Sequence, residues 1–256
     1  MRSLLVLLAL APLAAQAQMK IPDYNWVGAG ARTRPAYDGS AAHETELIPS
    51  VRYFGAPWFA RTTQGILEGG ARLELSPDLH LGAQLAYEAG RTASEAPFLS
   101  DHDVPDIHYT ASAGVHAEWD SHLGPAPTTM LARVRQLLDT DRGAQADLRY
   151  TVGVLGWRGL SAALFFQGTW ASAKSNQSFY GVSNDLAAST RLPAYSPGGG
   201  LLFTTGGILY GIDLSKSWLI VGNIETRRLQ GAAARSPLVE QPTSRYLSAS
   251  LAYRWN

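Results

Sequence analysis

The feature that most constrains this chain is a period-two alternation of apolar and polar side chains over segments of about ten residues. Residues 107 to 119 show it best, because every second side chain from Ile107 to Trp119 is apolar or aromatic. The intervening positions carry mostly polar side chains, such as His116 and Glu118. Residues 67–75, 79–88, 145–155 and 245–255 repeat the pattern. Repeated alternation of this kind predicts strands with one apolar and one polar face.

Two fold classes share such strands, since a soluble β-sandwich also alternates. The predicted strands, however, run about nine to eleven residues, the length that crosses a bilayer when tilted. The middle of each apolar face lacks Lys and Arg, which cost about 2 to 4 kcal/mol when they face lipid at the midplane. These features favour a closed antiparallel transmembrane β-barrel. Aromatic side chains that would form its interfacial girdles are Trp119, Trp170, Trp218, Tyr253 and Trp255.

The number of strands is predicted to be about twelve. Candidate strands lie near 26–33, 46–54, 57–63, 65–75, 79–89, 107–119, 128–138, 145–155, 160–170, 198–204, 207–214, 217–228 and 245–255. Bacterial barrels prefer even numbers, and residues 198–214 become one strand if it runs through Gly206 and Gly207. Ten strands remain an alternative. Short turns at 76–78 and 214–216 alternate with longer loops near 34–45, 90–106, 171–197 and 229–243, as expected for such barrels.

The first residues have the pattern of an export signal. Arg2 precedes an apolar run from Leu4 to Leu13, which ends in the small-residue sequence Ala15-Gln16-Ala17. A run of about ten apolar residues is too short to cross a bilayer as a helix. We therefore expect residues 1–17 to be a signal peptide cleaved after Ala17. Residues 18–256 would then form one barrel domain, exported through the periplasm to the cell outer membrane.

Charge and cysteine content exclude several function classes. The 21 basic and 21 acidic side chains balance, which removes the usual electrostatic basis of nucleic-acid binding. The chain has no cysteine, and so no disulfide framework and no thiolate metal site. Charged side chains fall instead on the polar strand faces, where they would line a lumen. The lumen candidates are Glu74, Glu88, His116, Glu118, Arg133, Arg135 and Arg149, accompanied by Arg72, Asp147, Asp213, Glu225 and Arg227.

The sequence offers little support for catalysis or metal binding. Of the six histidines, His80, His108 and His116 fall on the lumen face and His43, His102 and His122 in loops, where ordinary polar roles are favoured. Residues 101–103 and Asp106 could hold a divalent cation, but a solvated loop is the favoured interpretation. No phosphate loop, HExxH or nucleophile elbow occurs. We assign no catalytic, cofactor-binding or metal residue and no cofactor. The amide- and aromatic-rich residues 175–183 could contact a sugar or peptide, or fold inward as a plug. We assign no ligand to them.

Several short motifs, taken in order, resemble those of one family. Gly39 and Ser40 end an opening strand and first loop, and Gly90-Arg91 follows a later strand. Further landmarks are Tyr180-Gly181-Val182, the Pro193 to Tyr195 segment and Ser236-Pro237. The series resembles the MltA-interacting protein / outer-membrane protein V (MipA/OmpV) family over nearly the whole mature chain. Members usually end on an aromatic residue, whereas Asn256 follows Trp255 here, which weakens the C-terminal signal for barrel assembly.

The resemblance implies a function as well as a fold. It implies an outer-membrane scaffold that brings a murein-degrading lytic transglycosylase together with a murein synthase. It also implies contact with outer-membrane lipid and with the barrel-assembly machinery during biogenesis. A narrow porin-like channel for small solutes is the alternative, and an outer-membrane enzyme is less favoured. Strand number leaves the choice open, since eight-stranded barrels are filled by side chains and those of 16 to 18 strands hold a water channel.

Overall fold

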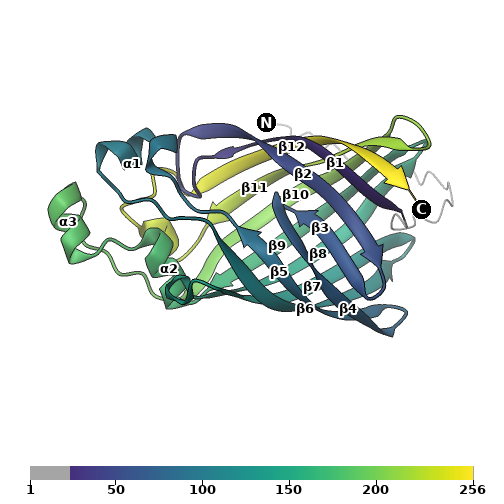
Figure 1. Cartoon of the computed structure of the whole chain (residues 1–256), viewed down its shortest axis with the longest axis horizontal. Coiled ribbons are helices and arrows are strands. Elements are labelled where there is room, and N and C mark those ends of the chain that lie inside the picture. The colour runs from purple at the N-terminus through teal and green to yellow at the C-terminus, as the bar shows by residue number, and fades with distance from the viewer. Residues whose placement is uncertain (1–23, 256) are drawn as a thin grey trace, which may run out of the picture.

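The computed structural model describes residues 24–255, which form a closed barrel of twelve antiparallel strands (Figure 1). Each strand pairs with its neighbours along the chain, and β1 closes the barrel against β12. The predicted fold class and strand number are confirmed. The expected signal peptide at 1–17 and the final Asn256 lie outside the described residues. The strands are β1 (Asn25–Pro35), β2 (His43–Gly55), β3 (Trp58–Thr63), β4 (Ile66–Ser76), β5 (Leu79–Glu88), β6 (Thr110–Leu123), β7 (Ala126–Leu137), β8 (Ala144–Trp157), β9 (Leu160–Ala171), β10 (Gly200–Asp213), β11 (Trp218–Leu229) and β12 (Thr243–Trp255).

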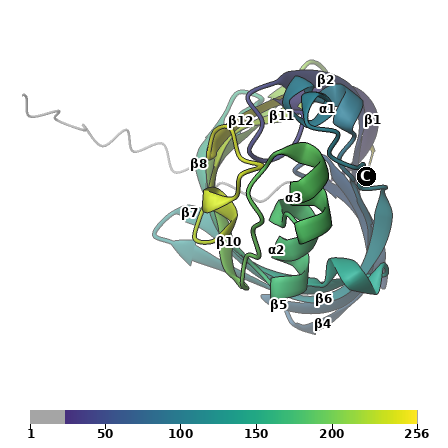
Figure 2. The same cartoon turned by 90° about the vertical axis from the view of Figure 1, so that its left-hand side faces the viewer.

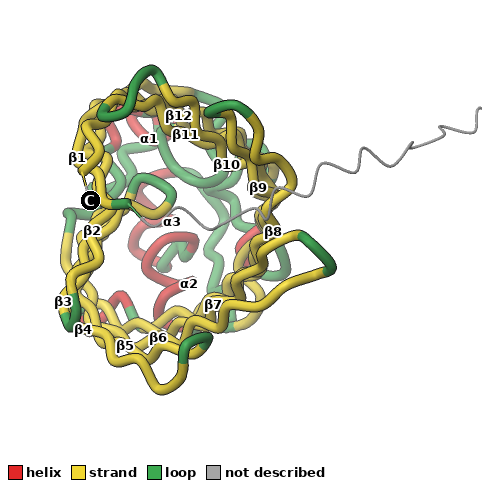
Figure 3. The backbone as a smooth tube through the Cα atoms, turned by 90° about the vertical axis from the view of Figure 1, so that its right-hand side faces the viewer, coloured by secondary structure: helices red, strands yellow, loops and turns green. Residues whose placement is uncertain are grey.

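The two ends of the barrel differ. All helical segments lie at one end, and the end of β12 lies at the other, with the short turns (Figure 1). Viewed end on, α2 and α3 lie across the barrel mouth (Figure 2), and they are visible through the ring of strands from the opposite end (Figure 3). None of the described helices is long and apolar enough to span a membrane. The helical segments are η1 (Ala93–Glu95), α1 (Pro97–Asp101), η2 (Thr140–Arg142), α2 (Ala173–Tyr180), α3 (Asn184–Thr190) and η3 (Ala233–Arg235).

The alternation in the sequence separates the outer surface from the lumen. Leu85 on β5 and Val115 on β6 are 60% and 61% exposed on the outside, whereas Gln84 and Ser112 on the same two strands are buried inside. Outward aromatic side chains lie near both ends of the strands, as expected for the two membrane interfaces. Those toward the short-turn end are Trp58, Trp119, Trp157, Trp218 and Tyr253, and those toward the other end are Tyr87, Tyr109 and Trp170.

Some predicted boundaries were wrong, because strand pairing rather than the apolar pattern sets where a strand ends. His122, predicted in a loop, lies in β6, whose end pairs with the start of β7. His43, also predicted in a loop, is the first residue of β2 and pairs with Pro35. His108, predicted on a strand face, is exposed and precedes β6, since Ile107 makes only an isolated bridge.

Candidate functional site

The centre of the lumen is built around Arg133 on β7. Its guanidinium donates to Asp147 on the adjacent strand β8 at 2.9 Å and to Glu68 on β4 at 2.6 Å. The first contact follows from strand register, because Arg133 and Asp147 are directly paired. The second contact joins β7 to β4, which lies three strands away around the barrel wall. Glu68 also accepts from Arg61 on β3, so one connected set of charges runs from β3 to β8 inside the barrel.

More strands join this set. Arg135 donates to Glu88 on β5 at 2.9 Å, and Ser112 on β6 donates to the same carboxylate at 2.7 Å. Glu118 accepts from Arg61 and lies 3.6 Å from Arg72. All these side chains sit on the inward faces of β3 to β8. We call them the lumen ion-pair network: Arg61, Glu68, Arg72, Glu88, Glu118, Arg133, Arg135 and Asp147.

A second set of polar side chains lies on the barrel wall across the lumen from the lumen ion-pair network. β3 is only six residues long, and the turn after it places Gln64 where its amide donates to Glu225 on β11 at 3.1 Å. Glu225 also accepts from Asn223 at 3.0 Å. Arg227 donates to Asp38 of the first loop at 2.7 Å. The hydrogen bond from Gln64 therefore crosses the lumen from the β3–β4 turn to β11.

The lumen candidates from the sequence divide into three groups. Five lie buried among the polar side chains described above: Glu88, His116, Glu118, Arg133 and Arg135. Arg149 is buried but lies outside the network. Glu74 is exposed near the short-turn end of β4, and Asp213 is likewise at the rim, paired with Arg254. Sequence reasoning missed Arg61 and Glu68, although the alternation at 67–75 puts Glu68 on the polar face.

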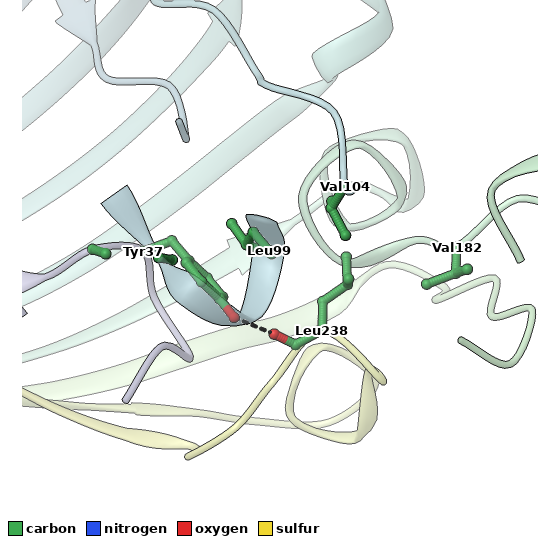
Figure 4. Packing of buried hydrophobic residues seen from close by; sticks show 7 residues of the cluster. Tyr37, Leu99, Val104, Val182 and Leu238 are labelled. Atoms are coloured by element: carbon green, nitrogen blue, oxygen red, sulfur yellow. Dashed lines mark hydrogen bonds between the residues drawn. The ribbon is translucent and has the colours of Figure 1, made fainter. Parts of the chain in front are cut away.

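The barrel mouth at the end opposite the short turns is covered by loops that share a small apolar core. Tyr37, Leu99, Val104, Val182 and Leu238 come from four different loops and pack together (Figure 4). The Tyr37 hydroxyl donates to the Leu238 carbonyl at 2.8 Å. We call this unit the loop cap; it comprises residues 36–42, 89–109, 172–199 and 230–242. The segment 171–197 is thus part of a folded cover at the barrel mouth.

The family-motif residues all converge in the loop cap. Arg91 donates to the carbonyl of Phe179 at 2.7 Å, and Ser236 donates to that of Tyr180, also at 2.7 Å. Tyr195 donates to the Ala232 carbonyl at 2.8 Å. The motif positions placed here are Gly39, Ser40, Gly90, Arg91, Tyr180, Gly181, Val182, Pro193, Tyr195, Ser236 and Pro237.

Two of these positions require glycine. Gly39 has a φ of +111°, a conformation that disfavours other residues. A Cβ on Gly90 would lie 1.7 Å from the Ile107 carbonyl oxygen, because the neighbouring Arg91 bridges to Ile107. The two ends of the connection between β5 and β6 can therefore close together only over a residue without a side chain.

Burial in the loop cap shifts the ionisation of its tyrosines. Desolvation, reinforced by the nearby Glu240, raises the pKa of Tyr37. Desolvation also raises the pKa of Tyr180 well above its ordinary value. Both phenols therefore stay neutral at physiological pH and act as packed, hydrogen-bonding side chains.

Residues 101–103 and Asp106, which the sequence offered as a possible cation site, make hydrogen bonds within their own loop. Asp106 accepts from the backbone N–H of Ala93 at 2.7 Å, and the His102 ring nitrogen lies 2.8 Å from the Phe98 carbonyl oxygen. Within residues 24–255 no group of three or more His, Asp or Glu side chains is arranged to hold a metal ion.

Comparison with known proteins places the chain in a family. A family model described as "MltA-interacting protein MipA" matches residues 27–255. No curated protein matches significantly. Among solved structures, the COG4313 outer membrane channel from Pseudomonas putida F1 aligns with a TM-score of 0.52 and 10% identity, covering 94% of this chain and 98% of that one. At that identity the likeness shows the fold alone.

Two further solved structures align more loosely. The NanC porin has a TM-score of 0.46 and 13% identity, covering 90% of this chain and all of its own. LpxR from Salmonella typhimurium has a TM-score of 0.45 and 8% identity, covering 88% of this chain and 99% of its own. The family match spans almost all the described residues and agrees with the barrel fold, and the chain therefore belongs to the MipA family of outer-membrane β-barrel proteins.

Proposed function

We propose that this protein is a non-conducting outer-membrane scaffold that holds peptidoglycan enzymes at its periplasmic end. The observation that carries the proposal is the lumen ion-pair network. A permeation path needs continuous space along the barrel axis, whereas Glu68, Arg133 and Asp147 are no more than 4% exposed. Charges that line a water-filled pore would be open to solvent.

The loop cap supports the same proposal from the other mouth. A solute entering there would have to separate an apolar core that includes Leu99 and Leu238, both at most 1% exposed. Several loop-to-loop hydrogen bonds would also have to break. Closure at two levels along the axis favours a structural role over transport.

The partner class follows from the family description and from the orientation of the barrel. The description names an interaction with MltA, a lytic transglycosylase, and the family resemblance adds a murein synthase. In such barrels the short turns face the periplasm, where murein lies. The short turns at 56–57, 77–78, 124–125, 158–159 and 214–217 would then carry the binding surface. Lipid would contact the apolar outer face, and the barrel-assembly machinery would act only during insertion. We propose no enzymatic activity.

Site-specific photo-crosslinking in intact cells tests this proposal. A photoreactive amino acid at the exposed Pro125 turn should capture a lytic transglycosylase, because that turn faces the periplasm. The matched control is Asp185 on α3, exposed at the opposite end. Capture at neither position, or equal capture at both, would remove the support for a periplasmic docking surface.

The second candidate is a narrow channel for small solutes. The observation that favours it is the fold shared with the COG4313 outer membrane channel. It requires the network and the loop cap to open, whereas the scaffold does not. Electrical recording separates the two candidates.

A further inference from the structure

We propose that the lumen holds a small anion, such as chloride, bound at Arg149. This side chain points inward from β8 and is only 7% exposed. It makes no ion pair and no hydrogen bond with any residue from 24 to 255. The proposal does not rest on the scaffold role, because a closed barrel can hold an ion whether or not it binds an enzyme.

The other buried arginines show how unusual this is. Arg32, Arg133 and Arg135 each have a carboxylate within 4 Å. Arg91 and Arg142 lie in or beside the loop cap and donate to backbone carbonyls. Among the buried arginines of the described chain, Arg149 alone has neither kind of partner. Arg52 also lacks a carboxylate, but it is only partly buried and donates to the Tyr24 carbonyl.

The surroundings hold the Arg149 guanidinium in place without neutralising it. Its central carbon lies 3.9 Å from the centre of the Phe165 ring, which is completely buried. That ring lies over Gly207, where a Cβ would come within 2.7 Å of it. The stack fixes one face of the guanidinium, and a cation on an aromatic face still carries its full charge.

The inward-facing carboxylates of Glu225 on β11 and Asp147 on β8 are already engaged. Both oxygens of Glu225 accept hydrogen bonds, one from Gln64 and Asn223 and the other from Arg227. Both oxygens of Asp147 are likewise used, one by Arg133 and the other by Thr169 and Gln167. Neither carboxylate has an oxygen within 4 Å of an Arg149 nitrogen.

A buried cation without a partner is strongly unfavourable, since protein charges away from water are paired or bind ions. None of the Arg149 nitrogens is among the fully enclosed polar atoms that lack a partner, so space remains beside them. The Thr205 hydroxyl, on the inward face of β10, is enclosed and also without a partner. Arg149 on β8 and Thr205 on β10 both pair in register with Gln167 on β9, so the two unused donors lie at one level of the lumen, two strands apart, where a small anion can bind between them.

Thermal unfolding of the detergent-solubilised protein tests the site. Replacing sodium gluconate by sodium chloride at constant ionic strength should raise the unfolding temperature of the wild type. This rise should level off as the chloride concentration increases, as expected for binding to the native state. Arg149→Met should abolish this rise, and in gluconate it should be at least as stable as wild type because it removes the unpaired charge. Arg228→Met, at an exposed outward position on β11, should keep the chloride effect.

A diffraction experiment supplies the second readout. A crystal grown in bromide should show an anomalous peak beside the Arg149 guanidinium, and Arg149→Lys, which keeps the charge if Arg149→Met does not fold, should retain the chloride effect. Equal responses to chloride and gluconate in wild type would overturn the proposal. So would an unchanged chloride effect in Arg149→Met, or a bromide crystal without the peak.

Discussion

At the residue scale, the lumen contains buried charged side chains that are stable there only when they are paired with opposite charges. Arg133 satisfies two carboxylates that come from opposite ends of the network, Glu68 and Asp147. Each of the three is desolvated, so none can exchange its partner for water. A single substitution that removes the arginine leaves Glu68 with Arg61 alone and Asp147 with the more distant Arg135, so two buried carboxylates lose their shared cation. Such a loss costs far more than the modest net contribution of the intact pair.

This predicts a large effect from Arg133→Ala. Breaking a buried pair by removing one partner costs about 3 to 5 kcal/mol. The measurement is equilibrium unfolding in detergent and denaturant, with Arg228→Ala as a control whose side chain is exposed and unpaired among the described residues. The Arg228 variant should match wild type. Equal stability of all three proteins would show that the network is not desolvated as described.

At the scale of the elements, strand alternation is the part of the structure that sequence encodes locally. On β6 the odd-numbered residues face outward and the even-numbered ones face the lumen, so lipid exposure can be assigned from parity. The boundaries are less local, because they depend on which strand lies alongside. The loop cap is the opposite case, since its core exists only when four loops meet.

The lipid face of β6 gives a depth-dependent prediction. Val115→Arg places a charge near the membrane midplane and should destabilise the inserted barrel by about 2 to 4 kcal/mol, whereas Leu123→Arg on the same outward face near the strand end should cost about 0 to 1 kcal/mol. Both side chains are more than 60% exposed, so packing differs little. Heat-modifiable gel migration after refolding into vesicles measures the difference. Equal losses would mean that the membrane does not cover β6 as inferred.

The loop cap gives a pH prediction. Burial raises the pKa of Tyr37 above that of an exposed tyrosine. The stabilisation by neutral Tyr37 is therefore complete below about pH 10, the ordinary tyrosine pKa, and is lost as pH rises toward the raised value. Cleavage of the cap loops by an alkaline protease should therefore begin to increase only above about pH 10, the ordinary tyrosine pKa. Tyr37→Phe cannot ionise there and should show a smaller increase; an identical increase would place the titration elsewhere.

At the scale of the whole molecule, sequence predicted the architecture better than the site. Period, strand length and the preference for an even strand number predicted a barrel of about twelve strands, and the inward placement of Glu118 and Arg135 followed from parity. The contact between Arg133 and Glu68 could not be predicted, because it joins strands that are 65 residues apart. Family resemblance marked Arg91 and Ser236, but only the folded loops reveal that both close the same cap. The lack of a partner for Arg149 is likewise a property of the closed lumen.

The central claim is that network and cap together close the lumen, and single-channel recording in planar bilayers tests it most directly. Purified wild-type protein, shown to be inserted by its heat-modifiable migration, should give no steady unitary conductance. A Glu68→Ala, Arg133→Ala double variant that still inserts should also stay silent, because the loop cap still covers one mouth, and it should conduct only when Leu238→Asp also disrupts the core of the cap. Regular conductance steps from the wild-type protein would contradict the account and favour the channel.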